Sequence, residues 1–416
     1  MLENAIESFS ESLFVYLSGR LTGGRGLLIK KHTENLQTFG DISFPISSKS
    51  WLEHIDQPIS REDGEDLLQL IEKTPKDIVQ ESNNWNLHVI KVKEEQGRLF
   101  MFLHRPSAIS LGLADGLNNI TLVSEKLQTQ CSKVYIDPLC VQTNCLTYLR
   151  TKYLSKVIEN LCSILLESDR HIPGIFVTSK SSSISKDAGY KILCSTVVNS
   201  KTSKKEVDIN ADDFIRSRQE EMTQIAQHKY GVRVTTDSKW KEFIAHLGES
   251  AVAFELLQIK PTSVVKINSD YMSGGNSKGA AFILYNCARL ETIMRTYEDK
   301  VKQGIYPSLP NFSEVDFTLL TQEDEWNVIF NYIMGFPSML ESCIEMKDGK
   351  CEFRPHFICS FLCSMVRVFS QYYRKTRILV EARQHLLPVV YARIHMLRIL
   401  NATLKTCLQI LNIKSV

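Results

Sequence analysis

The sequence predicts a multidomain α+β protein with a mixed N-terminal region, an α/β layer in the middle and an all-α bundle at the end. In the middle of the chain, short apolar runs typical of strands alternate with amphipathic helices, which favours an α/β layer. From about residue 270 the apolar residues recur at helical spacing almost throughout. A length of 416 residues also fits roughly two to three domains.

We expect three regions along the chain, at residues 1–120, 125–268 and 275–416. The first should open with an amphipathic helix and contain a β-hairpin at 87–103, where alternating apolar residues flank a turn. The second should place strands at 133–139, 174–179 and 191–198 around helices at 146–168 and 209–231. The third should consist of long helices at 280–298, 323–346, 355–379 and 392–413.

Charge is balanced overall but unevenly distributed. The net charge is only +2, yet the segment from Ser364 to Val416 has nine Lys or Arg residues and one acid. The segment from Asn311 to Trp326 has five acids and no base. A basic patch confined to one region is compatible with a nucleic-acid footprint on an otherwise neutral protein.

Cysteine usage and hydropathy indicate a cytoplasmic protein. The eleven cysteines contain no CxxC pair, and Cys359 and Cys363 are one helical turn apart on an apolar face, so we expect reduced thiols and no metal site. The first 20 residues lack a cationic start and a continuous apolar run, and no stretch approaches ~18 apolar residues. We therefore expect no membrane association, and no glycine-rich fingerprint predicts a cofactor.

The stretch AAFILYNCARLETIMRTYE, residues 280–298, combines a core stripe with an unusual opposite face. A four-three-four spacing places four apolar residues on one side of a helix, namely Ile283, Cys287, Leu290 and Met294. The other side is aromatic and cationic, with Tyr285, Asn286, Arg289 and Thr292. This face could be solvated surface or a binding surface.

A second segment, SQYYRKTRIL, gathers two aromatic residues and three cations, which are Tyr372, Tyr373, Arg374, Lys375 and Arg377. Unpaired RNA bases stack on aromatic rings while Lys and Arg neutralise the phosphates, so the segment suits an RNA contact. The alternative is a solvated helix end, because cations are favoured near a helix C-terminus.

The order of these segments resembles the DALR anticodon-binding domain of arginyl-tRNA synthetases. Phe282, Tyr285 and Arg289 match its opening helix, Tyr372, Tyr373 and Arg377 its middle, and Arg393 its closing helix, whereas Asn412 replaces the usual glycine near the end. The resemblance implies a set of RNA-binding residues, namely Tyr285, Arg289, Tyr372, Tyr373, Arg374, Lys375, Arg377 and Arg393. For Arg289 a structural ion pair inside the bundle is an equal alternative.

The resemblance extends upstream to a degenerate class I synthetase-like layer. Placed by Leu149 and Arg150, the His-x-Gly-His signature of that class falls on Cys145, Leu146, Thr147 and Tyr148, which contain neither histidine nor glycine. Lys201 to Lys204 keep a basic, hydroxyl-rich loop without the order of the second signature. The isolated histidines His104, His171 and His356 do not form another catalytic set. We therefore expect no enzymatic activity.

Two stretches, LYNCARLETI and QGIYPSLP, are similar to animal proteins that contain this anticodon-binding domain. That resemblance implies a non-catalytic adaptor that recognises arginine tRNAs and supports their 3-methylcytosine modification by a partner tRNA cytosine-N3 methyltransferase, with no DNA partner. Two alternatives remain open, a divergent arginine–tRNA ligase and a protein-interaction scaffold without RNA binding.

Overall fold

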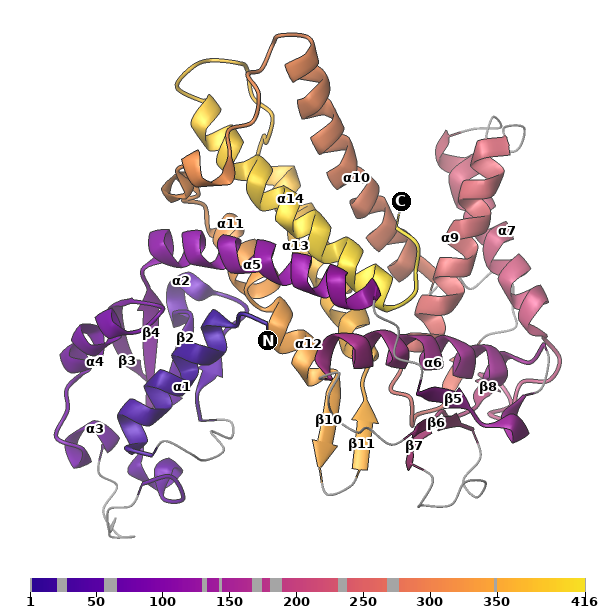
Figure 1. Ribbon diagram of the computed structural model, residues 1–416, viewed down its shortest axis with the longest axis horizontal. Helices are drawn as coiled ribbons and strands as arrows, with labels where there is room; N and C mark the ends of the chain where they lie inside the picture. The colour runs from indigo at the N-terminus through magenta and orange to yellow at the C-terminus, as the bar shows by residue number, and fades with distance from the viewer. Residues whose placement is uncertain are drawn as a thin grey trace. The chain divides into compact units, whose positions relative to one another are not determined.

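The computed structural model describes residues 2–20, 28–55, 66–128, 133–141, 144–166, 174–179, 189–230, 238–267, 277–347 and 350–415 (Figure 1). Its contacts divide the chain into two compact units. The first unit consists of Met1–Asn119, Tyr297–Ser338 and Gln371–Leu400, and the second of Ile120–Thr296, Met339–Ser370 and Asn401–Val416. These units are discontinuous in sequence, whereas the predicted regions run along the chain, and the boundaries at 1–120, 125–268 and 275–416 stay a prediction.

The N-terminal part of the first unit is a four-stranded antiparallel sheet with helices. The strand order is β1-β2-β4-β3, with β1 at Lys30–Lys31, β2 at Ile42–Pro45, β3 at Val89–Glu95 and β4 at Arg98–Leu103. The helices are α1 (Ala5–Ser18), α2 (Leu36–Phe39), α3 (Leu67–Leu70), α4 (Pro75–Glu81) and α5 (Arg105–Gln128), the last of which continues into the second unit.

The predicted hairpin at 87–103 is confirmed. Strands β3 and β4 pair antiparallel and are joined at Gln96 and Gly97, whose positive φ angles of 50° and 72° form the turn. Alternate residues of β4 enter the core, since Leu99, Met101 and Leu103 are at most 1% exposed. The predicted first helix is confirmed as α1.

Helix α5 crosses residues 333–334 at close range because of two glycines spaced one turn apart. A β-carbon on Gly112 would lie 2.5 Å from Cγ of Met334, and one on Gly116 would lie 2.4 Å from Cγ2 of Ile333. Neither position could hold a larger residue without displacing the neighbouring side chain. Both contacts lie within the first unit.

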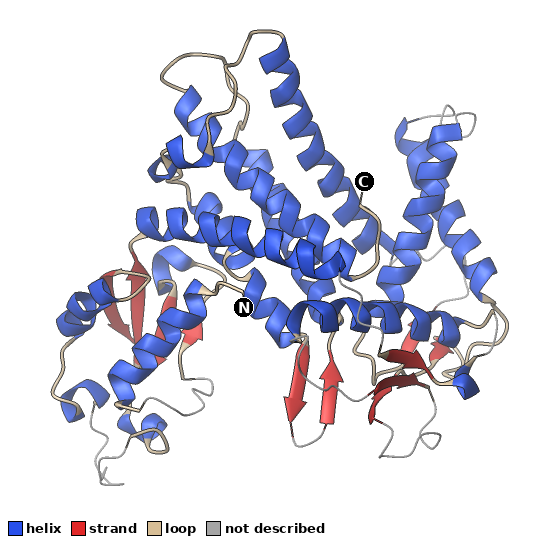
Figure 2. Cartoon of the chain, viewed as in Figure 1, coloured by secondary structure: helices blue, strands red, loops and turns tan. Residues whose placement is uncertain are grey.

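The second unit contains the α/β layer. A parallel sheet has the order β5-β6-β7, and a second parallel pair joins β8 to β9. Figure 2 draws the strands in red. The strands are β5 (Val134–Ile136), β6 (Gly174–Thr178), β7 (Gly189–Leu193), β8 (Val197–Asn199) and β9 (Val265–Ile267). The helices are α6 (Leu146–Leu165), α7 (Ala211–Tyr230) and α9 (Ser238–Leu257).

The strand predicted at 191–198 is in fact two strands in different sheets. The chain leaves β7 at Leu193, where the Cys194 amide still bonds the Thr178 carbonyl at 2.8 Å. The Ser195 amide then donates to the carbonyl of Pro261 at 2.8 Å, which redirects the chain toward β9. A continuous apolar run does not reveal such a change of partner.

The C-terminal part of the chain is largely helical. Its helices are α10 (Ser277–Lys302), α11 (Glu323–Val328), a π-helical turn η7 (Ile329–Ile333), α12 (Phe336–Ser342), α13 (His356–Lys375) and α14 (Leu387–Ile410). The expectation of an all-α region is corrected by one hairpin, β10 (Ile344–Lys347) with β11 (Lys350–Phe353). Asp348 and Gly349, between the two strands, lie outside the described residues.

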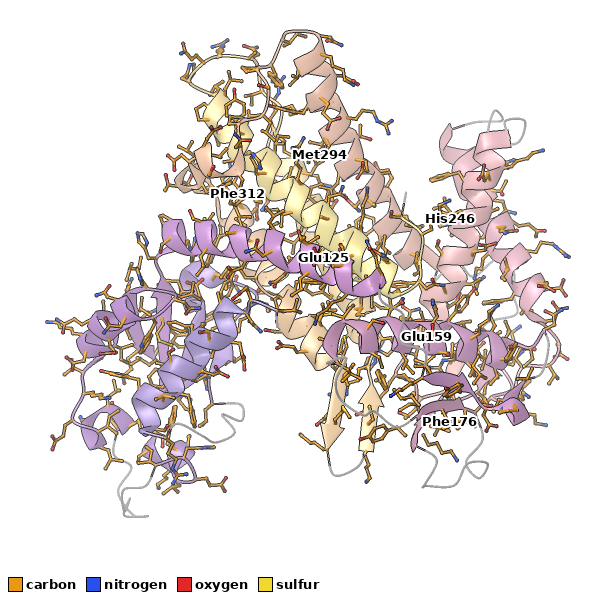
Figure 3. All side chains as sticks on the ribbon, viewed as in Figure 1. Glu125, Glu159, Phe176, His246, Met294 and Phe312 are labelled. Carbon is orange, nitrogen blue, oxygen red and sulfur yellow. The ribbon has the colours of Figure 1, made fainter. Side chains whose placement is uncertain are left out.

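The core stripe of α10 is confirmed, with Ile283, Cys287, Leu290 and Met294 all at most 8% exposed. Asn286, expected on the opposite face, is also buried and donates to the Phe282 carbonyl at 2.8 Å. Figure 3 labels Met294 on this helix.

Among the residues that the structure describes, no helix has both the length and the hydropathy needed to cross a membrane.

Candidate nucleic-acid interface

The basic end of α13 is exposed. Tyr373, Arg374 and Lys375 form the last turn of the helix, and Arg377 follows two residues later. The Tyr373 side chain is 40% exposed, and the three cations are exposed as well. An aromatic ring and three cations are therefore presented to solvent in the first unit, where the macrodipole of α13 also favours positive charge.

The buried carboxylate of Glu325, at the start of α11, organises this helix end from inside. Its Oε1 atom accepts from the Tyr372 hydroxyl at 3.1 Å and from Nε of Arg393 at 2.7 Å. Its Oε2 atom accepts from the Gln322 amide at 3.0 Å, which completes a capping box. Burial and the nearby carboxylate raise the pKa of Tyr372 well above its ordinary value.

This arrangement corrects the expectation that Tyr372 and Arg393 contact RNA. Tyr372 is 0% exposed and Arg393 is 9% exposed, so neither offers a face on which a base could stack. Their polar atoms instead bond Glu325 and fix α13 and α14 to α11. We therefore assign both residues a positioning role for the exposed helix end.

Three consecutive acidic residues of α11 each bond a different Arg or Lys side chain. Glu323 makes a two-pronged contact with Arg105, Asp324 bonds Lys375 at 2.9 Å, and Glu325 bonds Arg393. The Lys375 side chain remains 65% exposed, so its ion pair with Asp324 lies at the surface. In the sequence, the acidic stretch indicated only that this region is oppositely charged to the basic C-terminal segment. The Gln322-x-x-Glu325 spacing was the signal for the N-terminal cap of α11.

The second predicted surface lies on α10 in the second unit. The guanidinium of Arg289 lies 4.7 Å from the centroid of the Tyr285 ring, and its Nη2 donates to the Tyr285 hydroxyl at 2.9 Å. Nη1 also donates to Oδ1 of Asn286 at 3.3 Å. Tyr285 and Phe282 are 41% and 39% exposed, so the aromatic and cationic face predicted for this helix is at the surface.

The N-terminus of α6 is occupied by its own side chains. Cys145 is the N-cap, and its sulfur accepts from the Tyr148 amide at 3.3 Å. The hydroxyl of Thr147, a buried residue, accepts from the Val197 amide of β8 at 3.1 Å. One turn on, the buried guanidinium of Arg150 donates to five backbone carbonyls, those of Ser195, Leu256, Ile259, Lys260 and Ser263.

The remaining sequence candidates are a basic loop and three histidines. The loop at Lys201–Lys204 is exposed and is shaped by Asn199, whose Oδ1 accepts from the Lys201 amide at 2.9 Å. Burial and the charges of Lys260 and Arg354 lower the pKa of His356. His104 is exposed and bonds Ser107 at 2.8 Å, and His171 lies outside the described residues. Within the described part of the chain, no cluster of His, Cys, Asp or Glu could hold a metal ion.

Comparison with known proteins supports the predicted fold and domain. Residues 283–416 match the model of the DALR anticodon binding domain. The solved structure of arginyl-tRNA synthetase from Plasmodium falciparum superposes with a TM-score of 0.56 at 12% identity, covering 100% of this chain and 99% of that one. The chain therefore has an arginyl-tRNA synthetase-like fold with a C-terminal DALR domain, a combination that supports tRNA binding, and the predicted fold class is confirmed.

Two similar proteins have this domain in their names. The chain is 34% identical to DALR anticodon-binding domain-containing protein 3 of Danio rerio over 215 residues, which cover 50% of this chain and 38% of that protein. It is 30% identical to the protein of the same name from Mus musculus over 208 residues, 49% of this chain and 39% of that one. The predicted resemblance is confirmed, and the match spans about two fifths of the length of these relatives.

Proposed function

We propose that this protein is a non-catalytic tRNA-binding adaptor. It recognises arginine tRNAs through its DALR domain and supports their 3-methylcytosine modification, which a partner tRNA cytosine-N3 methyltransferase carries out in the cytoplasm. The observation that carries the RNA-binding part is the exposed end of α13, where Tyr373 lies beside Arg374, Lys375 and Arg377. A ring for stacking and cations for phosphates are the two parts that a single-stranded loop requires.

The α6 N-terminus supports the absence of catalysis. Class I synthetases activate ATP with the two histidines of the signature, which stabilise charge on the phosphate in the transition state. At the aligned positions this chain has Cys145 and Tyr148, and the glycine position is occupied by Thr147, whose hydroxyl bonds β8. A sulfur N-cap and a threonine whose hydroxyl accepts from β8 do not supply the two imidazole donors of that signature.

Arginine specificity and the methyltransferase partner rest on resemblance. The two animal relatives and the arginyl-tRNA synthetase-like fold support a tRNA of the arginine family as ligand. The separate α/β layer, which has lost the signature, is then available to hold the partner or another part of the tRNA. The partner supplies the methyl-transfer chemistry.

Filter binding over a salt series tests the RNA-binding part. The variant combines Tyr373→Ala, Arg374→Ala, Lys375→Ala and Arg377→Ala, and the ligand is an arginine tRNA transcript. Affinity should fall, and the slope of log K against log salt should flatten by about 2 to 3, because each phosphate contact contributes about 0.7–0.9. The matched control replaces Lys76, Lys93 and Lys302, three exposed lysines elsewhere, and should keep the slope.

Three results would overturn parts of the proposal. An unchanged slope in the four-residue variant would favour the scaffold alternative. Arginine-dependent ATP–pyrophosphate exchange by the purified protein would favour a divergent ligase. Arginine tRNAs that keep their full 3-methylcytosine content in cells lacking the protein would exclude the adaptor role.

A further inference from the structure

The parallel sheet β5-β6-β7 has two chemically different faces. Helix α6 contacts β5 and β6, and the apolar residues Ile175, Val177 and Ile192 are at most 5% exposed. The neighbouring positions point to the opposite face, because successive side chains alternate along a strand. There, Tyr135, Phe176 and Lys191 lie in one row across the three strands, since Tyr135 pairs with Phe176 and Phe176 with Lys191.

The two rings of this row are stacked, with Phe176 half-buried and Tyr135 exposed. Their centroids are 5.5 Å apart with an angle of 29° between the ring planes, and Tyr135 is 49% exposed on the outer strand. Glycine makes room for them, because a β-carbon on Gly174 would lie 3.2 Å from the Phe176 ring and 3.6 Å from the Tyr135 ring. Figure 3 labels Phe176 on this sheet and Glu159 on α6.

Charge distinguishes this face from an ordinary protein contact. Lys191 lies within the aromatic row, and the exposed Lys133 lies two residues before Tyr135. Lysine is depleted from the cores of protein–protein interfaces, whereas aromatic rings with neighbouring lysines are the chemistry that holds unpaired bases and their phosphates. Exposed aromatics on a sheet surface are a known arrangement for stacking bases of single-stranded RNA.

We propose that this face binds unpaired bases of RNA, with a base stacking on Tyr135 and extending the Tyr135–Phe176 stack. The inference rests on the proposed function, because the RNA is the tRNA held by the DALR domain. Under the proposed function the exposed end of α13 takes the anticodon loop, so we assign to this face bases from another part of the tRNA. Lys133 and Lys191 contribute positive charge for the adjoining phosphates.

Substitutions at Tyr135 test the site without removing a buried side chain. Tyr135→Leu keeps an apolar residue but lacks the ring, and Tyr135→Phe keeps the ring. With a full-length arginine tRNA transcript, Tyr135→Leu should bind about five- to 150-fold more weakly, the range expected for one lost stacked base. Tyr135→Phe should bind like the wild type, and the salt slope should not change because stacking releases no counterions.

The isolated anticodon stem-loop separates this site from the helical domain. Its affinity should be the same for wild type and Tyr135→Leu. Equal binding of the full tRNA by both proteins would exclude the site while leaving the proposed function intact. Failure of the wild type to bind any tRNA would instead remove the proposed function. If Tyr135→Leu loses a co-purifying protein but keeps its tRNA affinity, the face is a protein contact and the inference is wrong.

Discussion

Arg393 donates from Nε to Oε1 of Glu325 across 2.7 Å, although the two residues are 68 positions apart in the chain. Glu325 is fully buried, and the same oxygen accepts from the Tyr372 hydroxyl. The contact joins α14 to α11, while Tyr372 joins α13 to the same carboxylate. Two residues that the family resemblance implied as RNA contacts thus form the support beneath the exposed basic end of α13.

Removing the carboxylate should destabilise the first unit. Glu325→Ala leaves the Arg393 guanidinium and the Tyr372 hydroxyl buried without their acceptor, and breaking a buried pair costs about 3–5 kcal/mol. We expect the urea midpoint to fall accordingly. The unfolding is followed by tryptophan fluorescence, to which Trp326, 1% exposed beside Glu325, contributes together with the other three tryptophans. Glu325→Gln is the matched control and should lose less, because an amide oxygen can still accept one bond. Equal midpoints for wild type and Glu325→Ala would contradict the supporting role.

The adjacent tyrosines should behave in opposite ways. Tyr372→Phe removes one buried hydrogen bond and should lower the free energy of unfolding by about 1 kcal/mol without changing tRNA affinity. Tyr373→Leu removes an exposed ring and should weaken tRNA binding about five- to 150-fold without changing stability. Urea unfolding and filter binding on both variants check the pair. A loss of affinity in Tyr372→Phe alone would reverse the assignment.

The sequence alone could have distinguished the buried Tyr372 from the exposed Tyr373. Buried residues recur along α13 at Ile358, Leu362, Met365, Phe369 and Tyr372, which is the spacing of one helix face. The periodicity therefore predicts that Tyr372 is buried and Tyr373 exposed, whereas the family resemblance implied that both contact RNA. The partner of Arg393 was beyond such reasoning, because local periodicity says nothing about a carboxylate 68 residues away.

In the α/β layer, too, local spacing in the sequence predicted the elements but not the contacts between distant segments. Helix α6, the hairpin β3–β4 and the stripe of α10 followed from spacing, because each is decided by neighbours in sequence. The separation of β7 from β8 did not, since it depends on a hydrogen bond from Ser195 to Pro261. The row of Tyr135, Phe176 and Lys191 also required the register of β5, β6 and β7, which the sequence of such short strands does not reveal.

Arg150 should be essential to the stability of the second unit. Its guanidinium donates to five carbonyls at 2.8–3.1 Å, among them that of Leu256 near the end of α9, and burial lowers its pKa. Arg150→Met leaves buried carbonyls without donors, and we expect a loss of more than about 3 kcal/mol in urea unfolding. Arg150→Lys should recover only part, because an ammonium cannot span the same acceptors. If Arg150→Lys unfolds at the same urea concentration as the wild type, a positive charge at this position is enough for stability.

Lys31 should make the stability of the first unit depend on pH above neutrality. Its amine donates to the Phe330 carbonyl at 3.0 Å and lies so close to Gly335 that a β-carbon there would be 2.9 Å away. Desolvation lowers its pKa from 10.5 to about 7. Between these values the unfolded chain holds a proton that the folded protein has released, so the free energy of unfolding rises with pH.

The expected rise is up to about 1.4 kcal/mol for each pH unit across that window. Urea unfolding at pH 7, 8 and 9 measures it, and Lys31→Met serves as the reference because it cannot titrate. The difference in unfolding free energy between wild type and Lys31→Met should shift in favour of the wild type as pH increases. Parallel curves for the two proteins would mean that the amine keeps its ordinary pKa in the folded state.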